Sequence, residues 1–231
     1  MCRIIYFLSL LLFIGSSSIG FAHPRIKVVV FDFGGVIANM DEDKIVRFLS
    51  SHLEISNAQA QDLLKEFNTQ QKRGGDAEVF WRTYFLNHGL AWKREWIENL
   101  EGVMSCALTP NMAMIAIVQN LQMQWIRTAM LSNTTALHAS AIRKRGLYRY
   151  FSPLLLSYEI GVSKPDPLAF QILLSSLDKP ASACLFIDDK LTNVKAAVAL
   201  GIDSIQFHSA KQVQMELSQR GIRVSLHPPY R

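Results

Sequence analysis

Residues 28–35, with the sequence VVVFDFGG, decide the fold class of this chain. Four consecutive apolar residues, three of them β-branched, are typical of a strand buried on both faces, as in a parallel sheet. Asp32 follows this strand directly, and Gly34 and Gly35 then allow the chain to turn sharply. Because ligands bind beyond the carboxyl ends of parallel strands, a carboxylate here can serve as a nucleophile or a metal ligand. For this segment alone, an aspartate that only caps a turn is the simpler alternative.

Three later segments also place polar side chains at strand ends or in tight loops. They are AMLSNT at 129–134, GVSKPDP at 161–167 and CLFIDD at 184–189. The first ends in Ser132 and Asn133, the second carries Lys164, and the third ends in the paired carboxylates Asp188 and Asp189. Taken alone, a strand-end serine or a loop lysine would be structurally unremarkable, whereas four such segments in this order indicate an active site.

In this order the four segments resemble the motifs of the haloacid dehalogenase-like (HAD) hydrolase superfamily. The resemblance runs from Ile26 to about Gly221, and the SKPDP and DDxxxN stretches make it specific. It implies an α/β fold, with a doubly wound parallel sheet as the Rossmann-like core and an inserted all-helical cap domain. We expect the core at 23–40 and 109–231, and the cap at 41–108.

The periodicity of the chain predicts the same division. Asp32 and Ser132 are 100 residues apart, too far for one strand–helix unit, and apolar residues between them recur at helical spacing. This pattern predicts four helices, around 45–53, 63–67, 80–84 and 96–104, with a turn at 72–76. Strands and helices then alternate, which predicts a parallel sheet with right-handed crossovers.

Particular residues predict where the elements of the core begin and end. Thr109 and Pro110 suit the N-cap and first position of a helix that reaches Leu121, and Asp166 and Pro167 suit the start of another that reaches Leu177. The remaining predicted elements are strands ending at Leu131 and Ile187, a helix closed by Gly146, a helix ending near Gly201 and a strand at 205–207.

The resemblance implies phosphatase chemistry on a small phosphorylated substrate. Asp32 would attack phosphorus to form an aspartyl-phosphate, Ser132 would donate to phosphate oxygens, and Lys164 would neutralise the carboxylate–phosphate pair. The phosphate-binding residues would be Gly34, Gly35, Ser132, Asn133 and Lys164.

The resemblance also implies a Mg²⁺ cofactor, because a carboxylate can approach a phosphate only with a cation between them. Asp32, Asp188 and the main-chain carbonyl of Gly34 would bind the ion. Asp189 would be a weaker ligand or a hydrogen-bond acceptor beside it. Asn193 is an auxiliary candidate, for which we favour a structural role in bracing the Asp188–Asp189 loop.

The chain departs from the usual family pattern at Gly34. Relatives with phosphatase activity usually carry a second aspartate there, which protonates the leaving oxygen, and losing a general acid costs about 10²–10⁴ in rate. This D-x-G variant resembles glucose-1-phosphate phosphatase-like members, and an anomeric phosphate has a good leaving group. We therefore expect a sugar phosphate, such as an aldose 1-phosphate. Asp41 would supply the missing proton or bind a sugar hydroxyl; alternatively, it caps the first cap helix.

Two other functions stay open on the sequence. A 2-haloacid dehalogenase uses the same aspartate without a metal, and would require an arginine for the substrate carboxylate, for which Arg47 and Arg73 are candidates. A non-catalytic phospholigand-binding module would also tolerate Gly34. The net charge of +5 is scattered along the chain, so we expect no nucleic-acid partner. The sequence does not indicate the oligomeric state.

The N-terminus has the pattern of a secretory signal peptide at 1–22. Arg3 precedes an apolar stretch at 4–14, and a small-x-Ala sequence ends at Ala22. We expect export to the periplasm or the medium, with no stable membrane association after cleavage. The alternative is an uncleaved membrane anchor, because the segment could just span a bilayer.

Overall fold

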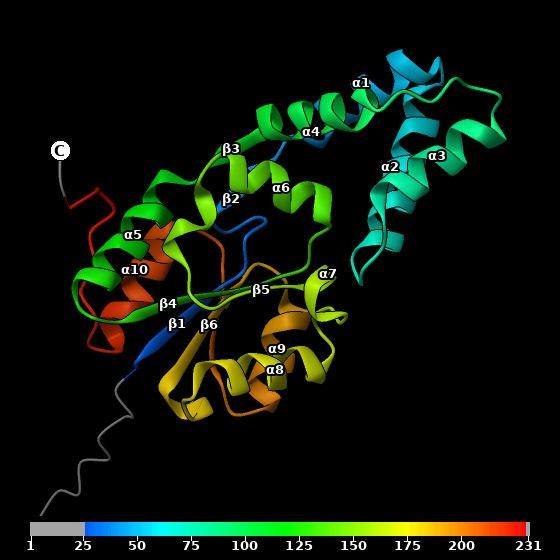
Figure 1. Cartoon of the computed structure of the whole chain (residues 1–231). Helices are drawn as coiled ribbons and strands as arrows, with labels where there is room; N and C mark the ends of the chain where they lie inside the picture. The colour runs from blue at the N-terminus through cyan, green and yellow to red at the C-terminus, as the bar shows by residue number, and fades with distance from the viewer. Residues whose placement is uncertain (1–25, 230–231) are drawn as a thin grey trace, which may run out of the picture.

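The computed structural model describes residues 26–229 of the 231-residue chain (Figure 1). The predicted signal peptide therefore lies outside the described residues. Within the described part, no helix combines the length and the apolar character needed to cross a membrane.

The core is a five-stranded sheet whose paired neighbours all run parallel, in the order β5-β4-β1-β6-β7. The five strands are β1 Val28–Phe31, β4 Arg127–Ser132, β5 Leu154–Leu156, β6 Cys184–Asp188 and β7 Asp203–Gln206. In register, Val30 of β1 lies between Ala129 of β4 and Phe186 of β6. β1 is thus the central strand, which explains why all four of its residues are buried.

Helices cover both faces of this sheet (Figure 1). One face packs against α5 Met112–Met123 and α10 Ala210–Gln219, and the other against α8 Pro167–Leu177 and α9 Leu191–Ala199. Residues of β1 alternate between the two clusters: Val29 and Phe31 face the first pair of helices, Val28 and Val30 the second. The doubly wound α/β architecture predicted from the sequence is confirmed.

Four helices between β2 Ala38–Met40 and β3 Leu108–Pro110 form the cap, which extends away from the sheet in Figure 1. They are α1 Glu42–Leu53, α2 Asn57–Gln71, α3 Ala77–Asn87 and α4 Glu95–Ala107. The cap has its own apolar cluster, in which Trp81 and Phe67 are fully buried. Leu137 of the core helix α6 Ala136–Lys144 joins this cluster, so α6 is the surface on which the cap rests.

Most predicted helix positions agree with the structure. Asp166 caps α8 and Pro167 is its first residue, as expected. The prediction at Thr109 and Pro110 was wrong: both belong to β3, which pairs antiparallel with β2, and Asn111 caps α5 instead. The capping preferences of these two residues are overridden by the pairing of β3 with β2, the two short strands that connect the cap to the core.

Smaller differences concern strands. The sequence analysis missed β2, β3 and the edge strand β5, whose three residues are too few for a periodic pattern. β7 begins two residues before the predicted strand and ends at Gln206, one residue earlier than predicted. A four-residue helix, α7 Ser157–Ile160, follows β5 and leads into the loop that carries Lys164.

Candidate active site

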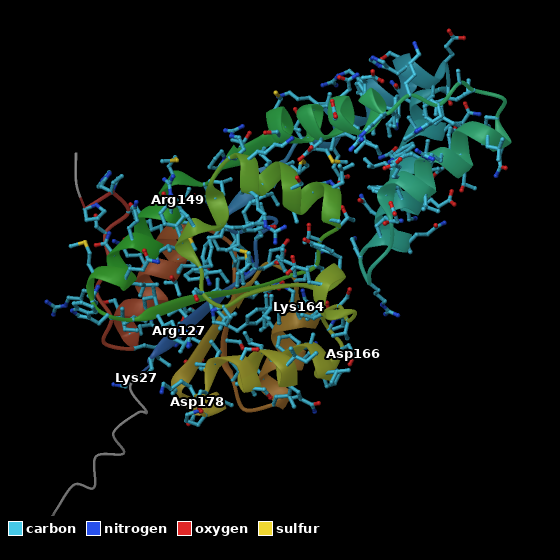
Figure 2. The ribbon with its side chains drawn as sticks, viewed as in Figure 1. Lys27, Arg127, Arg149, Lys164, Asp166 and Asp178 are labelled. Atoms are coloured by element: carbon cyan, nitrogen blue, oxygen red, sulfur yellow. The ribbon has the colours of Figure 1, made fainter. Side chains whose placement is uncertain are left out.

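Three polar residues meet because their strands are neighbours in the sheet. Asp32 follows β1, Ser132 ends β4 and Asp188 ends β6, and β4, β1 and β6 are adjacent. All three side chains are buried, and Asp188 is fully so. Figure 2 shows Lys164 at the end of the sheet nearer the cap, whereas Lys27 lies at the opposite end. The carboxyl ends of the central strands therefore form one polar cluster beneath the cap.

Lys164 lies between two of these carboxylates. Its Nζ is 2.9 Å from Oδ1 of Asp32 and 2.7 Å from Oδ2 of Asp188, and the residue is only 4% exposed. Burial keeps water from screening the two ion pairs, so the lysine strongly offsets the repulsion between the two carboxylates. The sequence analysis assigned Lys164 the neutralisation of a carboxylate–phosphate pair, and that role stays a prediction.

The side chain of Asn133 fixes the position of Lys164. Its Nδ2 donates to the main-chain carbonyl of Lys164 at 2.7 Å, and its Oδ1 accepts the main-chain N–H of the same residue at 2.9 Å. We expected Asn133 to contribute to phosphate binding. In the structure both ends of its amide are instead used to hold the lysine loop against the end of β4.

The carboxyl of Asp32 has a raised pKa. Burial is the main cause, since it disfavours the charged form; the nearby Lys164 opposes the rise and Asp188 adds to it. The ionised form of Asp32 thus depends on cationic neighbours, of which Lys164 is one.

Asp188 is oriented by neutral donors in addition to the lysine. Nδ2 of Asn193 lies 3.0 Å from each of its carboxylate oxygens, and the main-chain N–H of Lys190 donates to Oδ1 at 2.8 Å. Asn193 lies in the first turn of α9 and contacts the end of β6 from there, in the bracing position that we favoured for it.

The same cluster has the features of a site for a metal ion. Asp32, Asp188 and Asp189 each offer a carboxylate oxygen, and these oxygens lie within 4.8 Å of one another. Oδ1 of Asp189 is buried without a hydrogen-bond partner among the described residues. A Cβ at Gly35 would lie 2.8 Å from Oδ2 of Asp189, so only glycine leaves room for this carboxylate. An unpaired buried oxygen beside two other carboxylates fits a divalent cation.

Two neighbouring cavities adjoin the cluster. The larger, of about 420 Å³, is lined by Asp32, Lys164 and Asp189 and reaches Lys190. The smaller, of about 160 Å³, lies between core and cap and is lined by Ser132. Four residues line both cavities: Gly34, Met40, Glu42 and Asn133. The two cavities are therefore neighbours, one beside Asp32 and the other beside Ser132.

The smaller cavity contains polar residues that the sequence analysis did not assign to the site. Asn68 comes from α2 of the cap, Lys72 is the C-cap residue of that helix, and His138 comes from α6 of the core. His138 offered one usable signal, since it stands six residues after Ser132, in the first turn of the helix that follows the strand end. Asn68 and Lys72 offered none, because only the packing of the cap brings them there.

Burial lowers the pKa of two of these groups. It lowers the pKa of His138 to about 4, with the positive charge of Lys72 as a second cause, so the imidazole is neutral at pH 7. Burial also lowers the pKa of Lys72; Lys190 adds to this effect and Glu42 opposes it.

Three further candidates lie outside the cavities. Asp41 caps α1, accepting the N–H of Lys44 at 3.3 Å, which is the alternative role considered for it. Arg47 and Arg73, considered as clamps for a substrate carboxylate, are exposed and line neither cavity.

Comparison with known families and relatives identifies a family and several similar proteins. The sequence model of the haloacid dehalogenase-like hydrolases matches residues 26–201. A D-ribitol-5-phosphate phosphatase of Bacteroides thetaiotaomicron is 24% identical over 219 residues, covering 84% of this chain and 97% of the relative. Shorter matches include a chloroplast flavin mononucleotide hydrolase of Arabidopsis thaliana, 36% identical over 83 residues, and a sesquiterpene phosphatase of Aspergillus oryzae, 29% identical over 113 residues. These two cover 36% and 48% of this chain, and span 34% and 58% of the relatives.

Solved structures show the same fold. A haloacid dehalogenase family enzyme of Bacteroides thetaiotaomicron, in complex with magnesium and inorganic phosphate, superposes with a TM-score of 0.68 at 22% identity. That match covers 79% of this chain and 94% of the other. An L-2-haloacid dehalogenase of Xanthobacter autotrophicus superposes with a TM-score of 0.54 at 20% identity, covering 85% and 84%.

Proposed function

The chain belongs to the haloacid dehalogenase-like hydrolases, and from this premise we propose that it is a Mg²⁺-dependent phosphatase of small phosphorylated metabolites. The observation that carries the proposal is the buried cluster of Asp32, Lys164 and Asp188, with the unpartnered oxygen of Asp189 beside it. A cluster with this much buried negative charge is suited to binding a cation and a phosphate together.

Asp32 is the nucleophile in this proposal. Its carboxylate oxygen bonds to phosphorus, the phosphorus–oxygen ester bond breaks, and the leaving oxygen takes a proton from water. Water then hydrolyses the aspartyl-phosphate, which releases inorganic phosphate and regenerates the carboxylate. Lys164, 2.9 Å from Asp32, stabilises the negative charge that gathers during both steps.

Asp32, Asp188, Asp189 and the carbonyl of Gly34 would hold Mg²⁺. When bound, the ion would neutralise the carboxylates and the phosphate oxygens, so that two anions can approach each other. Ser132, which is buried and lines the smaller cavity, is the proposed hydroxyl donor to the phosphate oxygens.

The substrate is proposed to be a sugar or polyol phosphate. Gly34 offers no carboxyl to protonate a leaving oxygen, which favours phosphates with good leaving groups, such as an aldose 1-phosphate. The relative that matches over most of its length is a D-ribitol-5-phosphate phosphatase, so a polyol phosphate is the other main candidate.

A 2-haloacid dehalogenase is the second candidate, favoured by Gly34. It would need neither a metal nor the pair Asp188–Asp189, and the arginines considered for it are exposed on the surface. A non-catalytic phospholigand-binding module would bind phosphates without turnover.

One set of assays separates the three functions. The mature chain is assayed with p-nitrophenyl phosphate and a panel of sugar phosphates, in EDTA and after Mg²⁺ is added back. The Asp32→Asn variant serves as the control. Magnesium-dependent turnover supports the phosphatase, and metal-free halide release from 2-chloropropionate supports the dehalogenase. Tight phosphate binding with no turnover above the control supports the binding module.

Export is also part of the proposal. It rests on the signal-peptide pattern at 1–22, and the alternative is an anchored protein. Cell fractionation followed by N-terminal sequencing of the isolated protein tests it. A mature N-terminus at residue 23 in the soluble extracytoplasmic fraction supports cleavage; an intact N-terminus in the membrane fraction contradicts it.

A further inference from the structure

We propose that the smaller cavity is a hydroxyl-binding subsite, in which His138 and Asn68 bind a hydroxyl group of the leaving alcohol. The enzyme would then select phosphate esters of polyols or sugars and reject those of apolar alcohols. This inference rests on the proposed phosphatase function and deepens it.

The size of the cavity suits a small leaving group. Its volume of about 160 Å³ is close to that of a cavity of about 150 Å³ that accommodates benzene, so a leaving group with five or six carbons fits. Gly34 and Asn133 line both cavities, and we place the phosphate where the two adjoin, between Asp32 of the larger cavity and Ser132 of the smaller.

His138 supplies a neutral hydrogen-bond donor. Its Nδ1 lies 2.9 Å from Oγ1 of Thr135, and this oxygen also accepts the main-chain N–H of His138 at 3.2 Å. In the proposed arrangement the hydroxyl hydrogen is donated to Nδ1, and the imidazole proton lies on Nε2. The depressed pKa keeps the ring uncharged near neutrality, so Nε2–H can donate to a hydroxyl without attracting anions.

Asn68 supplies the complementary acceptor. Its Oδ1 is buried and has no donor among the described residues, although Asn68 lines the cavity. A buried acceptor without a partner costs about 1–3 kcal/mol, and a ligand hydroxyl can remove that cost. A hydroxyl both donates and accepts, so it can pair with Asn68 from the cap and His138 from the core at once.

Lys72 and Glu42 extend the same polar surface. Lys72, the C-cap residue of α2, follows Asn68 by four residues and hence lies on the same side of the helix, and Glu42 lines both cavities. An apolar alcohol in this cavity would leave these polar groups unpaired, a situation in which enzymes discriminate strongly between analogues. The relatives include both a polyol-phosphate phosphatase and a sesquiterpene phosphatase, so this choice of substrate class is open.

The test compares two substrates of equal length and equal leaving-group type. D-Ribitol 5-phosphate and n-pentyl phosphate are both five-carbon esters of a primary alcohol, and only the first carries further hydroxyls. With Mg²⁺, we expect kcat/KM of the full-length mature protein to favour the polyol by about 100-fold or more. His138→Phe should lower that ratio about 10-fold, and His138→Gln, which keeps an N–H donor, should restore part of it.

Two more variants make the test robust. Asn68→Leu alters the cap side of the cavity and should also lower the ratio about 10-fold; it provides the same measurement if His138→Phe does not fold. His227→Phe, at an exposed position near the C-terminus, is the matched control and should leave the ratio unchanged.

The possible failures are distinguishable. Equal losses for both substrates in His138→Phe and Asn68→Leu, or a wild-type preference for pentyl phosphate, would overturn the subsite and leave the phosphatase standing. A wild-type protein that hydrolyses neither ester, nor any sugar phosphate of the panel, aldose 1-phosphates included, faster than Asp32→Asn would overturn the proposed function itself.

Discussion

Replacing Lys164 with methionine tests the electrostatic basis of the site. The change removes a buried ammonium that lies 2.9 Å from Asp32 and 2.7 Å from Asp188, and leaves two buried carboxylates facing each other. At an effective dielectric constant of 20, one charge pair at 2.9 Å is worth about 6 kcal/mol before desolvation is counted. Breaking a buried pair typically destabilises a protein by about 3–5 kcal/mol, which we take as the expected loss.

The assay is thermal unfolding of the metal-free protein at pH 7. In a domain of this size, 1 kcal/mol corresponds to about 2–4 °C, so Tm should fall by about 6–20 °C in Lys164→Met. Added Mg²⁺ should raise Tm more in the variant than in the wild type, because the variant site carries one more uncompensated negative charge. Turnover should fall about 10²–10³-fold, as expected when a charge-stabilising group is lost.

An exposed ion pair with an equally short contact is the control. Arg82 and Glu78 lie 2.7 Å apart on α3 and both are exposed, so Arg82→Met should cost less than about 1 kcal/mol. The reasoning would be refuted if Lys164→Met and Arg82→Met lowered Tm equally, or if Lys164→Met left it unchanged.

Three further predictions follow from the site. Because burial raises the pKa of Asp32, its protonated form stabilises the fold below about pH 3.8 and that stability is lost as the pH rises through the raised pKa. In EDTA at pH 7, Asp32→Asn should therefore unfold at a higher temperature than the wild type while lacking activity; a lower Tm would contradict this. Gly34→Asp should fold, since a Cβ there meets no atom within 4 Å, and should accelerate D-ribitol 5-phosphate hydrolysis more than that of glucose 1-phosphate, by up to about 10²–10⁴-fold. Asp41→Asn should change the hydrolysis rate of neither substrate much. Equal rates in the wild type and in both variants would contradict the hypothesis that a general acid is missing at Gly34. The pKa of His138 is lowered from 6.5 to about 4. The wild type should therefore lose up to about 3 kcal/mol of folding stability as the pH falls from 6.5 to about 4. Measurements of Tm against pH should show that His138→Gln no longer has this loss. If the variant and the wild type had the same pH profile, a buried neutral imidazole would be contradicted.

The sequence predicted those parts of the fold that depend on local patterns. The apolar run of β1 and the Asp166–Pro167 start of α8 follow from burial and capping chemistry, and both lie where expected. The pair β2 and β3 could not be predicted in this way. Each has three residues, and their pairing depends on the cap being inserted between them.

The same distinction applies to the residues of the active site. Asp32, Ser132 and Asp188 could be predicted to meet because strand ends converge at one edge of a parallel sheet. Asn68 and His138 are 70 residues apart and line the same cavity only because the cap lies against the core. No pattern in either helix indicates this contact, so substrate-binding residues stay hidden when they depend on the placement of a cap.

The formal charges of the site provide an argument for a metal that does not depend on relatives. Asp32, Asp188 and Asp189 contribute three negative charges, and Lys164 offsets one of them. A site with the remaining two charges would repel a phosphate dianion, whereas a bound divalent cation brings the sum to zero. A 2-haloacid has a single negative charge and is attacked at a neutral carbon, so it has less need of such compensation. The third carboxylate, Asp189, is therefore the residue that most favours the phosphatase over the dehalogenase.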